Sequence, residues 1–68
     1  MSITIYTNYL VVSYDIDFPG TKEELASALD EGSVLLNTVD SNKKITGSIL
    51  VNPLNAVLIE IKDTPHNS

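Results

Sequence analysis

The side chains that could do acid–base or nucleophilic chemistry are few in this sequence. Histidine occurs once, as His66, and the 68 residues contain no cysteine and no arginine. An imidazole-activated nucleophile therefore has one candidate base, and that base lies in a polar C-terminal run without an apolar anchor. We predict that the protein is not an enzyme.

Two acidic segments could in principle hold a hard cation. Asp15 and Asp17 share one face of a strand, and carboxylate oxygens suit calcium or magnesium. Asp40-Ser41-Asn42 begins like a calcium loop, but the glycine and the closing glutamate are absent at the required positions. A solvated strand face and an ordinary turn explain these segments more simply, so we predict no metal and no cofactor.

Charge and hydropathy exclude other classes of partner. Nine acidic residues oppose four lysines, for a net charge of −5, and arginine is not available for bidentate phosphate contacts. Direct binding to nucleic acid is therefore not expected. The apolar runs are only a few residues long, much shorter than a bilayer span, and a cytoplasmic location without membrane attachment is expected.

Alternating hydropathy predicts a strand from Leu10 to Phe18. The apolar side chains of its inner face are Leu10, Val12, Tyr14, Ile16 and Phe18. Ile3 and Ile5 have the opposite parity, so the apolar face would change sides near Thr7. A bulge or a tight turn is expected at that point.

A short helix should follow this strand. Pro19 and Gly20 end the strand, and Thr21 with Glu24 forms a capping box. The apolar helix face consists of Leu25, Ala28 and Leu29. Gly32 is placed to end the helix, after about ten residues, in a left-handed conformation.

Three further strands are predicted after the helix. Residues 33–39 and 44–51 form a hairpin around turn residues 40–43, and residues 56–62 form the last strand after a break at Pro53. Short connections favour antiparallel meander pairing of these three strands. Residues 1–63 should form one domain, with a disordered tail at residues 64–68.

The expected fold class is α+β. It is a small antiparallel sheet of about four strands, in the order strand, helix, strand, strand, strand, with one short helix on one face. A partly closed SH3-like or Sm-like barrel is the alternative, and the pattern does not separate the two.

The strands carry more apolar side chains than one short helix can cover. We predict that this second set forms an interface with another copy of the chain, most simply a twofold dimer. The predicted interface residues are Tyr6, Tyr9, Val11, Leu35, Val39, Leu50 and Leu58, and the pattern leaves Leu36 open as the alternative to Leu35. Barrel closure is the competing explanation, because a barrel would bury part of both sets within one chain.

One segment resembles a known family. The run from Val51 to Glu60, VNPLNAVLIE, is similar to a strand-turn-strand signature of small FlbD-type flagellar proteins and of short uncharacterised phage and Gram-positive proteins. The resemblance implies a small β-rich assembly or accessory protein, and it assigns no role to individual residues.

The sequence therefore favours a non-enzymatic interaction protein that acts as a homo-oligomer. Its acidic surface or its tyrosine-bearing edge would engage another protein, and an accessory factor of a phage or mobile element would fit. The alternative is a small-ligand-binding protein with a pocket between subunits. That function requires polar groups such as Asn8, Asn37 or Asn52 to converge at an apolar seam.

Overall fold

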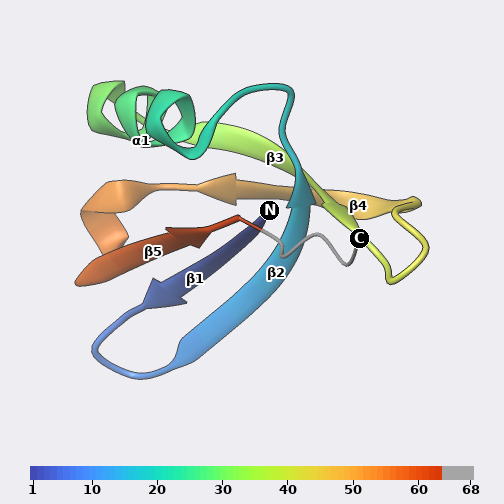
Figure 1. Cartoon of the computed structure of the whole chain (residues 1–68). Helices are drawn as coiled ribbons and strands as arrows, with labels where there is room; N and C mark the ends of the chain where they lie inside the picture. Colours follow the sequence, from blue (N-terminus) through green and yellow to red (C-terminus); the bar gives the residue numbers. More distant parts are fainter. Residues whose placement is uncertain (64–68) are drawn as a thin grey trace.

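The computed structural model describes residues 1–63, which form an antiparallel five-stranded sheet and one α-helix (Figure 1). The elements are β1 (Ser2–Tyr6), β2 (Val11–Asp17), α1 (Lys22–Glu31), β3 (Val34–Val39), β4 (Ile45–Val51), the 3-10 helix η1 (Pro53–Asn55) and β5 (Leu58–Lys62). The α+β class is confirmed. Among these elements no helix has the length and hydropathy needed to cross a membrane. The tail predicted at residues 64–68 lies outside the described residues.

The N-terminal region contains two strands, which makes five strands where about four were predicted. The N–H of Thr7 donates to the carbonyl of Leu10 at 2.9 Å, and the hydroxyl of Thr7 accepts from the N–H groups of Tyr9 and Leu10. This tight turn reverses the chain, so β1 and β2 pair antiparallel. The turn also explains the opposite parities of the two segments. In the antiparallel pair Ile3 lies opposite Tyr14 and Ile5 lies opposite Val12, so the apolar side chains of both strands are on one side of the sheet.

The meander predicted for the last three strands is wrong for β5. β3 and β4 do form a hairpin, but β5 pairs with β1, which gives the strand order β4-β3-β2-β1-β5. The side chain of Asn52 accepts from the N–H of Leu54 at 3.1 Å and starts η1, with Pro53 in its first turn. This helical turn carries the chain away from β4 to the free edge of β1.

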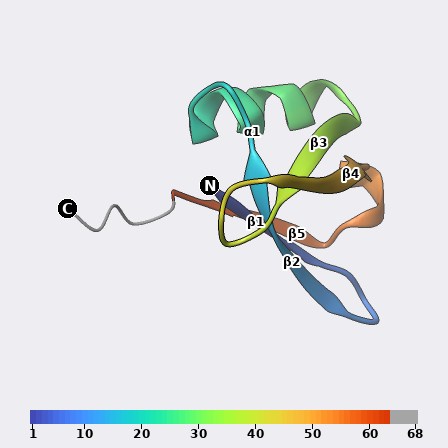
Figure 2. The same cartoon turned by 90° about the vertical axis from the view of Figure 1, so that its right-hand side faces the viewer.

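β2 connects the two halves of the sheet. Residues 11–15 of β2 pair with β1, whereas Ile16 and Asp17 pair with Thr38 and Asn37 of β3. Figure 2 shows the β1–β2–β5 half and the β3–β4 half meeting at β2 at a steep angle. Within residues 1–63 no hydrogen-bonded ladder joins β4 to β5, so both remain edge strands.

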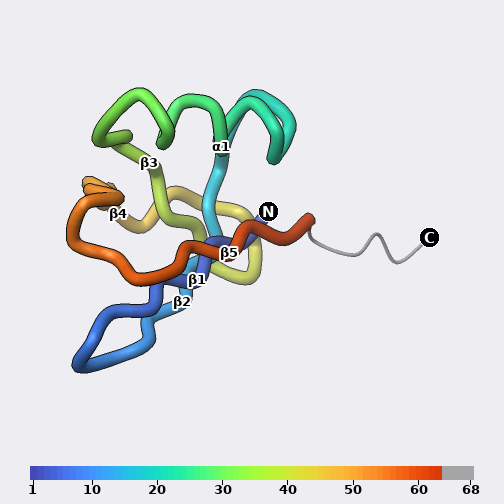
Figure 3. Tube along the Cα trace, turned by 90° about the vertical axis from the view of Figure 1, so that its left-hand side faces the viewer, coloured from blue at the N-terminus to red at the C-terminus, as the bar shows by residue number. Residues whose placement is uncertain are grey.

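The core lies inside this bent sheet, with α1 across it (Figure 3). Its buried members are Ile3, Ile16, Leu25, Leu29, Leu36 and Val51. The predicted helix face is confirmed, since Leu25 and Leu29 are buried and Ala28 is half-buried. The predicted inner face of β2 is confirmed except at Leu10, which lies in the turn and is exposed.

The helix begins as predicted but ends differently. Thr21 and Glu24 form both hydrogen bonds of the capping box, at 3.2 and 3.3 Å. Gly32 ends the helix with φ 157° and ψ −160°, so the left-handed conformation predicted there is wrong. This region of backbone space is essentially limited to glycine. The last turn contains Asp30 and Glu31 and no basic residue, which opposes the helix dipole.

Candidate functional site

Part of the predicted interface set gathers at the end of the β1–β2 hairpin. Tyr6 lies directly across from Val11 on β2 and from Leu58 on β5, so the three side chains share one face. We call this region the tyrosine surface, formed by Tyr6, Tyr9, Leu10, Val11, Val57 and Leu58. Tyr9 is 94% exposed, and Val11 and Leu58 are more than half exposed.

The tyrosine surface ends abruptly along the strands. On the same outer face, the next row contains Thr4 and Ser13, whose hydroxyls are hydrogen-bonded at 2.8 Å, and Glu60. The row after that contains Asp15 and Lys62. The apolar area is therefore confined to the tip of this half of the sheet, the lowest part of Figure 1.

The other predicted interface residues lie on the outer face of the β3–β4 hairpin. Leu35 pairs with Leu50, and these side chains are 68% and 67% exposed. Asn37 accepts a hydrogen bond from the hydroxyl of Ser48 at 3.0 Å. We call this region the hairpin surface, formed by Leu35, Asn37, Val39, Ile45, Ser48 and Leu50. Neither β3 nor β4 contains a charged residue.

Ile45 was missed by the sequence analysis, and a bulge explains why. Thr38 pairs with Gly47, but Val39 pairs with Ile45, so one residue of β4 is skipped. The shift changes the parity of β4 and places Ile45, 61% exposed, on the same face as Val39. Gly47 in the middle of a strand was the available signal, since such a glycine often marks a bulge.

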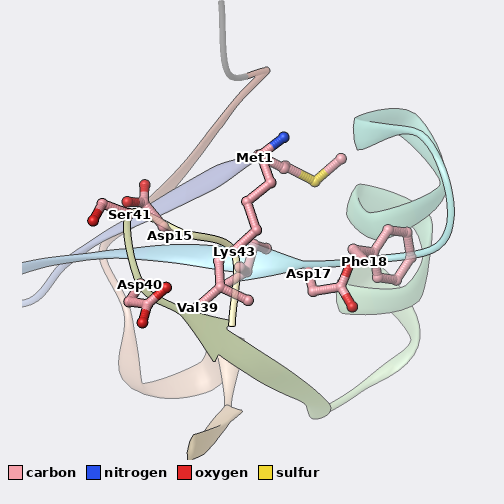
Figure 4. A pocket seen from close by; sticks show the side chains of 9 residues that line it. Met1, Asp15, Asp17, Phe18, Val39, Asp40, Ser41 and Lys43 are labelled. Atoms are coloured by element: carbon pink, nitrogen blue, oxygen red, sulfur yellow. The ribbon is translucent and has the colours of Figure 1, made fainter. Parts of the chain in front are cut away.

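A pocket of about 310 Å³ lies between β2 and the β3–β4 turn (Figure 4). It brings Asp15 and Asp17 close to Asp40 and Lys43. The full lining is Met1, Asp15, Ile16, Asp17, Phe18, Val39, Asp40, Ser41 and Lys43. Within residues 1–63 no three histidine, cysteine or carboxylate side chains are placed to hold a metal ion.

Asp40 has a role in the turn itself. Its carboxylate accepts from the N–H groups of Asn42 at 2.8 Å and Lys44 at 3.0 Å, while its backbone exchanges hydrogen bonds with Lys43 and Lys44. Lys43 adopts a positive φ of 64° to complete the reversal. The segment that begins like a calcium loop is the ordinary turn that was predicted.

Replacing Asp40 with alanine should therefore weaken the hairpin. The two N–H groups lose their acceptor, and we expect a loss of about 1–2 kcal/mol in the free energy of unfolding. Thermal and urea unfolding followed by circular dichroism would measure it. Asp40→Asn, which keeps the accepting oxygen, should lose much less, and equal losses in the two variants would contradict the role of the hydrogen bonds.

The polar groups considered for a ligand site lie on separate elements of the chain. Asn8 is in the β1–β2 turn, Asn37 is bonded to Ser48 on the hairpin surface, and Asn52 caps η1. The two latter side chains are therefore already engaged within the chain. His66 lies outside the described residues.

Comparison with family models, with curated proteins and with solved structures finds no match to this chain. The resemblance of residues 51–60 to FlbD-type flagellar proteins therefore stays a prediction. The strand-turn-strand shape expected there is present, as the end of β4, η1 and the start of β5.

Proposed function

We propose that this protein is a non-enzymatic interaction protein that acts as a homo-oligomer, a twofold dimer, and that binds a second protein. One observation carries the proposal: among residues 1–63, nine large apolar side chains are exposed, against six that are buried. They are Tyr9, Leu10, Val11, Leu35, Ile45, Leu50, Leu54, Val57 and Leu58.

The energetics favour covering these side chains. Burying one Leu, Val or Ile is worth about 1.5–3 kcal/mol, and a domain of this length has a total stability of only about 3–10 kcal/mol. Scattered exposed apolar residues need no explanation, but these residues are grouped, because eight of the nine belong to the tyrosine surface or the hairpin surface. Grouped exposure of this kind is typical of an interface.

Closure of the sheet into a barrel within one chain would not cover the exposed apolar side chains. The bent β2, the pairing of β5 with β1 and the helical turn before β5 favour a partly closed, SH3-like barrel over an open sheet. Such closure buries only the inner face of the strands. Leu35, Leu50, Val11 and Leu58 lie on the outer face, so a partner molecule is needed to cover them.

The two surfaces suit different partners. The hairpin surface has no charge, so two copies of this acidic chain can meet there without repulsion at the contact. The tyrosine surface offers apolar area together with hydroxyl groups, a combination that is enriched at contacts between different proteins. We assign self-association to the first and binding of another protein to the second, in a cytoplasmic accessory factor of the kind that phages or mobile elements encode.

Light scattering over a concentration series tests the proposal. We expect a mass of twice the 7.4 kDa chain at about 0.1–1 mM, falling toward one chain on dilution to about 1 µM. Circular dichroism of the same samples would show that the chain stays folded. A well-folded chain with a mass of 7.4 kDa throughout this range would overturn the homo-oligomer.

A further inference from the structure

The two edges of the sheet differ in how they are protected. β5 contains Glu60 and Lys62, which form an ion pair at 3.5 Å, and the adjoining α1 contributes Lys22, which pairs with Asp63 at 3.5 Å. Charges of this kind discourage pairing with another strand. β4 is seven residues long, contains neither charge nor proline, and has residues 45–48 all exposed.

An edge of this type is open to pairing with a further strand. Alternate residues of β4 point their N–H and C=O groups toward β3, and the rest, about three residues, point them away from the sheet. Within residues 1–63 β4 has only β3 as a neighbour in the sheet. The outward groups can be satisfied by an extended segment in antiparallel or parallel pairing.

The geometry of β4 favours a second copy of β4 as that segment. A twofold axis at Ser48, the middle residue of the strand, sets Gly47 of one copy opposite Ile49 of the other and places the bulge at Thr46 beside Leu50. The hairpin surfaces of the two copies then join into one four-stranded outer face. Leu35 and Leu50 from both chains lie on that face.

The charges beyond the two ends of β4 are complementary under this arrangement. Lys43 and Lys44 precede β4, whereas Asp30 and Glu31 end α1, close to the start of β3. All four side chains are exposed, and the ion pairs found within residues 1–63 involve none of them. Figure 1 shows the 40–44 turn on the right and the end of α1 on the left, with β4 running between them.

The register places these groups within reach of one another. Val34 pairs with Val51, so Asn52 lies beside Ser33, shortly after Glu31 in the chain. In the twofold arrangement, with the bulge at Thr46 counted, Lys43 of the second copy would lie beside Asn52. It would then be two strand spacings, about 10 Å, from the backbone of Ser33, and the long lysine and glutamate side chains can span that gap.

We propose that two copies of this chain pair antiparallel through β4, with Lys43 and Lys44 of each copy facing Asp30 and Glu31 of the other. This inference rests on the homo-oligomer proposed above and specifies its interface. The lysines would also complement the negative end of the α1 dipole, because the last turn of α1 contains no basic residue. Pairing through one edge buries less than the standard interface of about 800 Å² per partner, so a micromolar dissociation constant is expected.

Charge reversal tests the arrangement by sedimentation equilibrium. We expect Lys43→Glu with Lys44→Glu to raise the dissociation constant at least about tenfold, and Asp30→Lys with Glu31→Lys to do the same. The second variant reduces the net charge from −5 to −1, so general repulsion alone would predict tighter association. The fourfold variant combines all four substitutions, so the positive and negative charges exchange places and the net charge is unchanged. Its dissociation constant should return to within about threefold of the wild-type value.

A backbone measurement completes the test. Amide hydrogen exchange of β4 should slow as the wild-type concentration rises, while the N–H groups of β5 should not respond. Reversals that leave the dissociation constant unchanged, a fourfold variant that stays weak, or a β4 without concentration-dependent protection would each overturn the β4 arrangement. In those cases a wild-type dimer would leave the proposed homo-oligomer intact, whereas a monomeric wild type would overturn both.

Discussion

Replacing Leu25 with aspartate is expected to leave most of the chain unfolded at room temperature. Leu25 is 0% exposed and lies in the core formed by α1 and the inner faces of the strands. The substitution removes about 2–5 kcal/mol of packing and places a carboxylate where no partner is available. Because a domain of this length has about 3–10 kcal/mol of stability in total, little or none should remain.

Far-UV circular dichroism and urea unfolding would measure this loss. Ser27→Asp is the matched control, because it adds the same carboxylate to an exposed position of the same helix. That variant should unfold within about 0.5 kcal/mol of the wild type. Leu29→Asp should act in the same direction as Leu25→Asp, since Leu29 is also buried. A cooperative transition at the wild-type midpoint in Leu25→Asp would mean that the helix packs through another face.

Replacing both Leu35 and Leu50 with aspartate should give a folded monomer. Both side chains are about two-thirds exposed, so the fold loses little packing. In a dimer paired through β4, Leu50 lies on the edge strand beside the other copy, so its loss acts twice, whereas Leu35 lies one strand further from the contact. Added repulsion between carboxylates acts in the same direction. We expect the dissociation constant to rise by about one to two orders of magnitude.

Sedimentation equilibrium and circular dichroism together would check this expectation. Val11→Asp is the control, because Val11 is similarly exposed but lies on the tyrosine surface. It should keep the wild-type dissociation constant. If Val11→Asp dissociated the dimer and the leucine variant did not, self-association would belong to the tyrosine surface, and the two roles assigned here would be exchanged.

Local features of this protein were determined by the sequence alone. The alternation along residues 11–17 correctly predicted which side of β2 is buried, because the two-residue period of a strand is a property of the backbone. Thr21 and Glu24 predicted the start of α1, and Asp40 predicted a turn, because each acts through hydrogen bonds to residues within four positions. The exposure of Leu50 followed from its parity in the same way, whereas the pattern did not decide which of Leu35 and Leu36 is exposed.

Only the tertiary structure decided how these elements come together. The pairing of β5 with β1 joins residues more than fifty positions apart, and no local pattern specifies which free edge a strand will choose. The bulge that turns Ile45 outward depends on the register between β3 and β4. The separation of the hairpin surface from the tyrosine surface follows from the bend of β2. Each of these features depends on contacts between distant segments, and sequence periodicity carries information only about near neighbours.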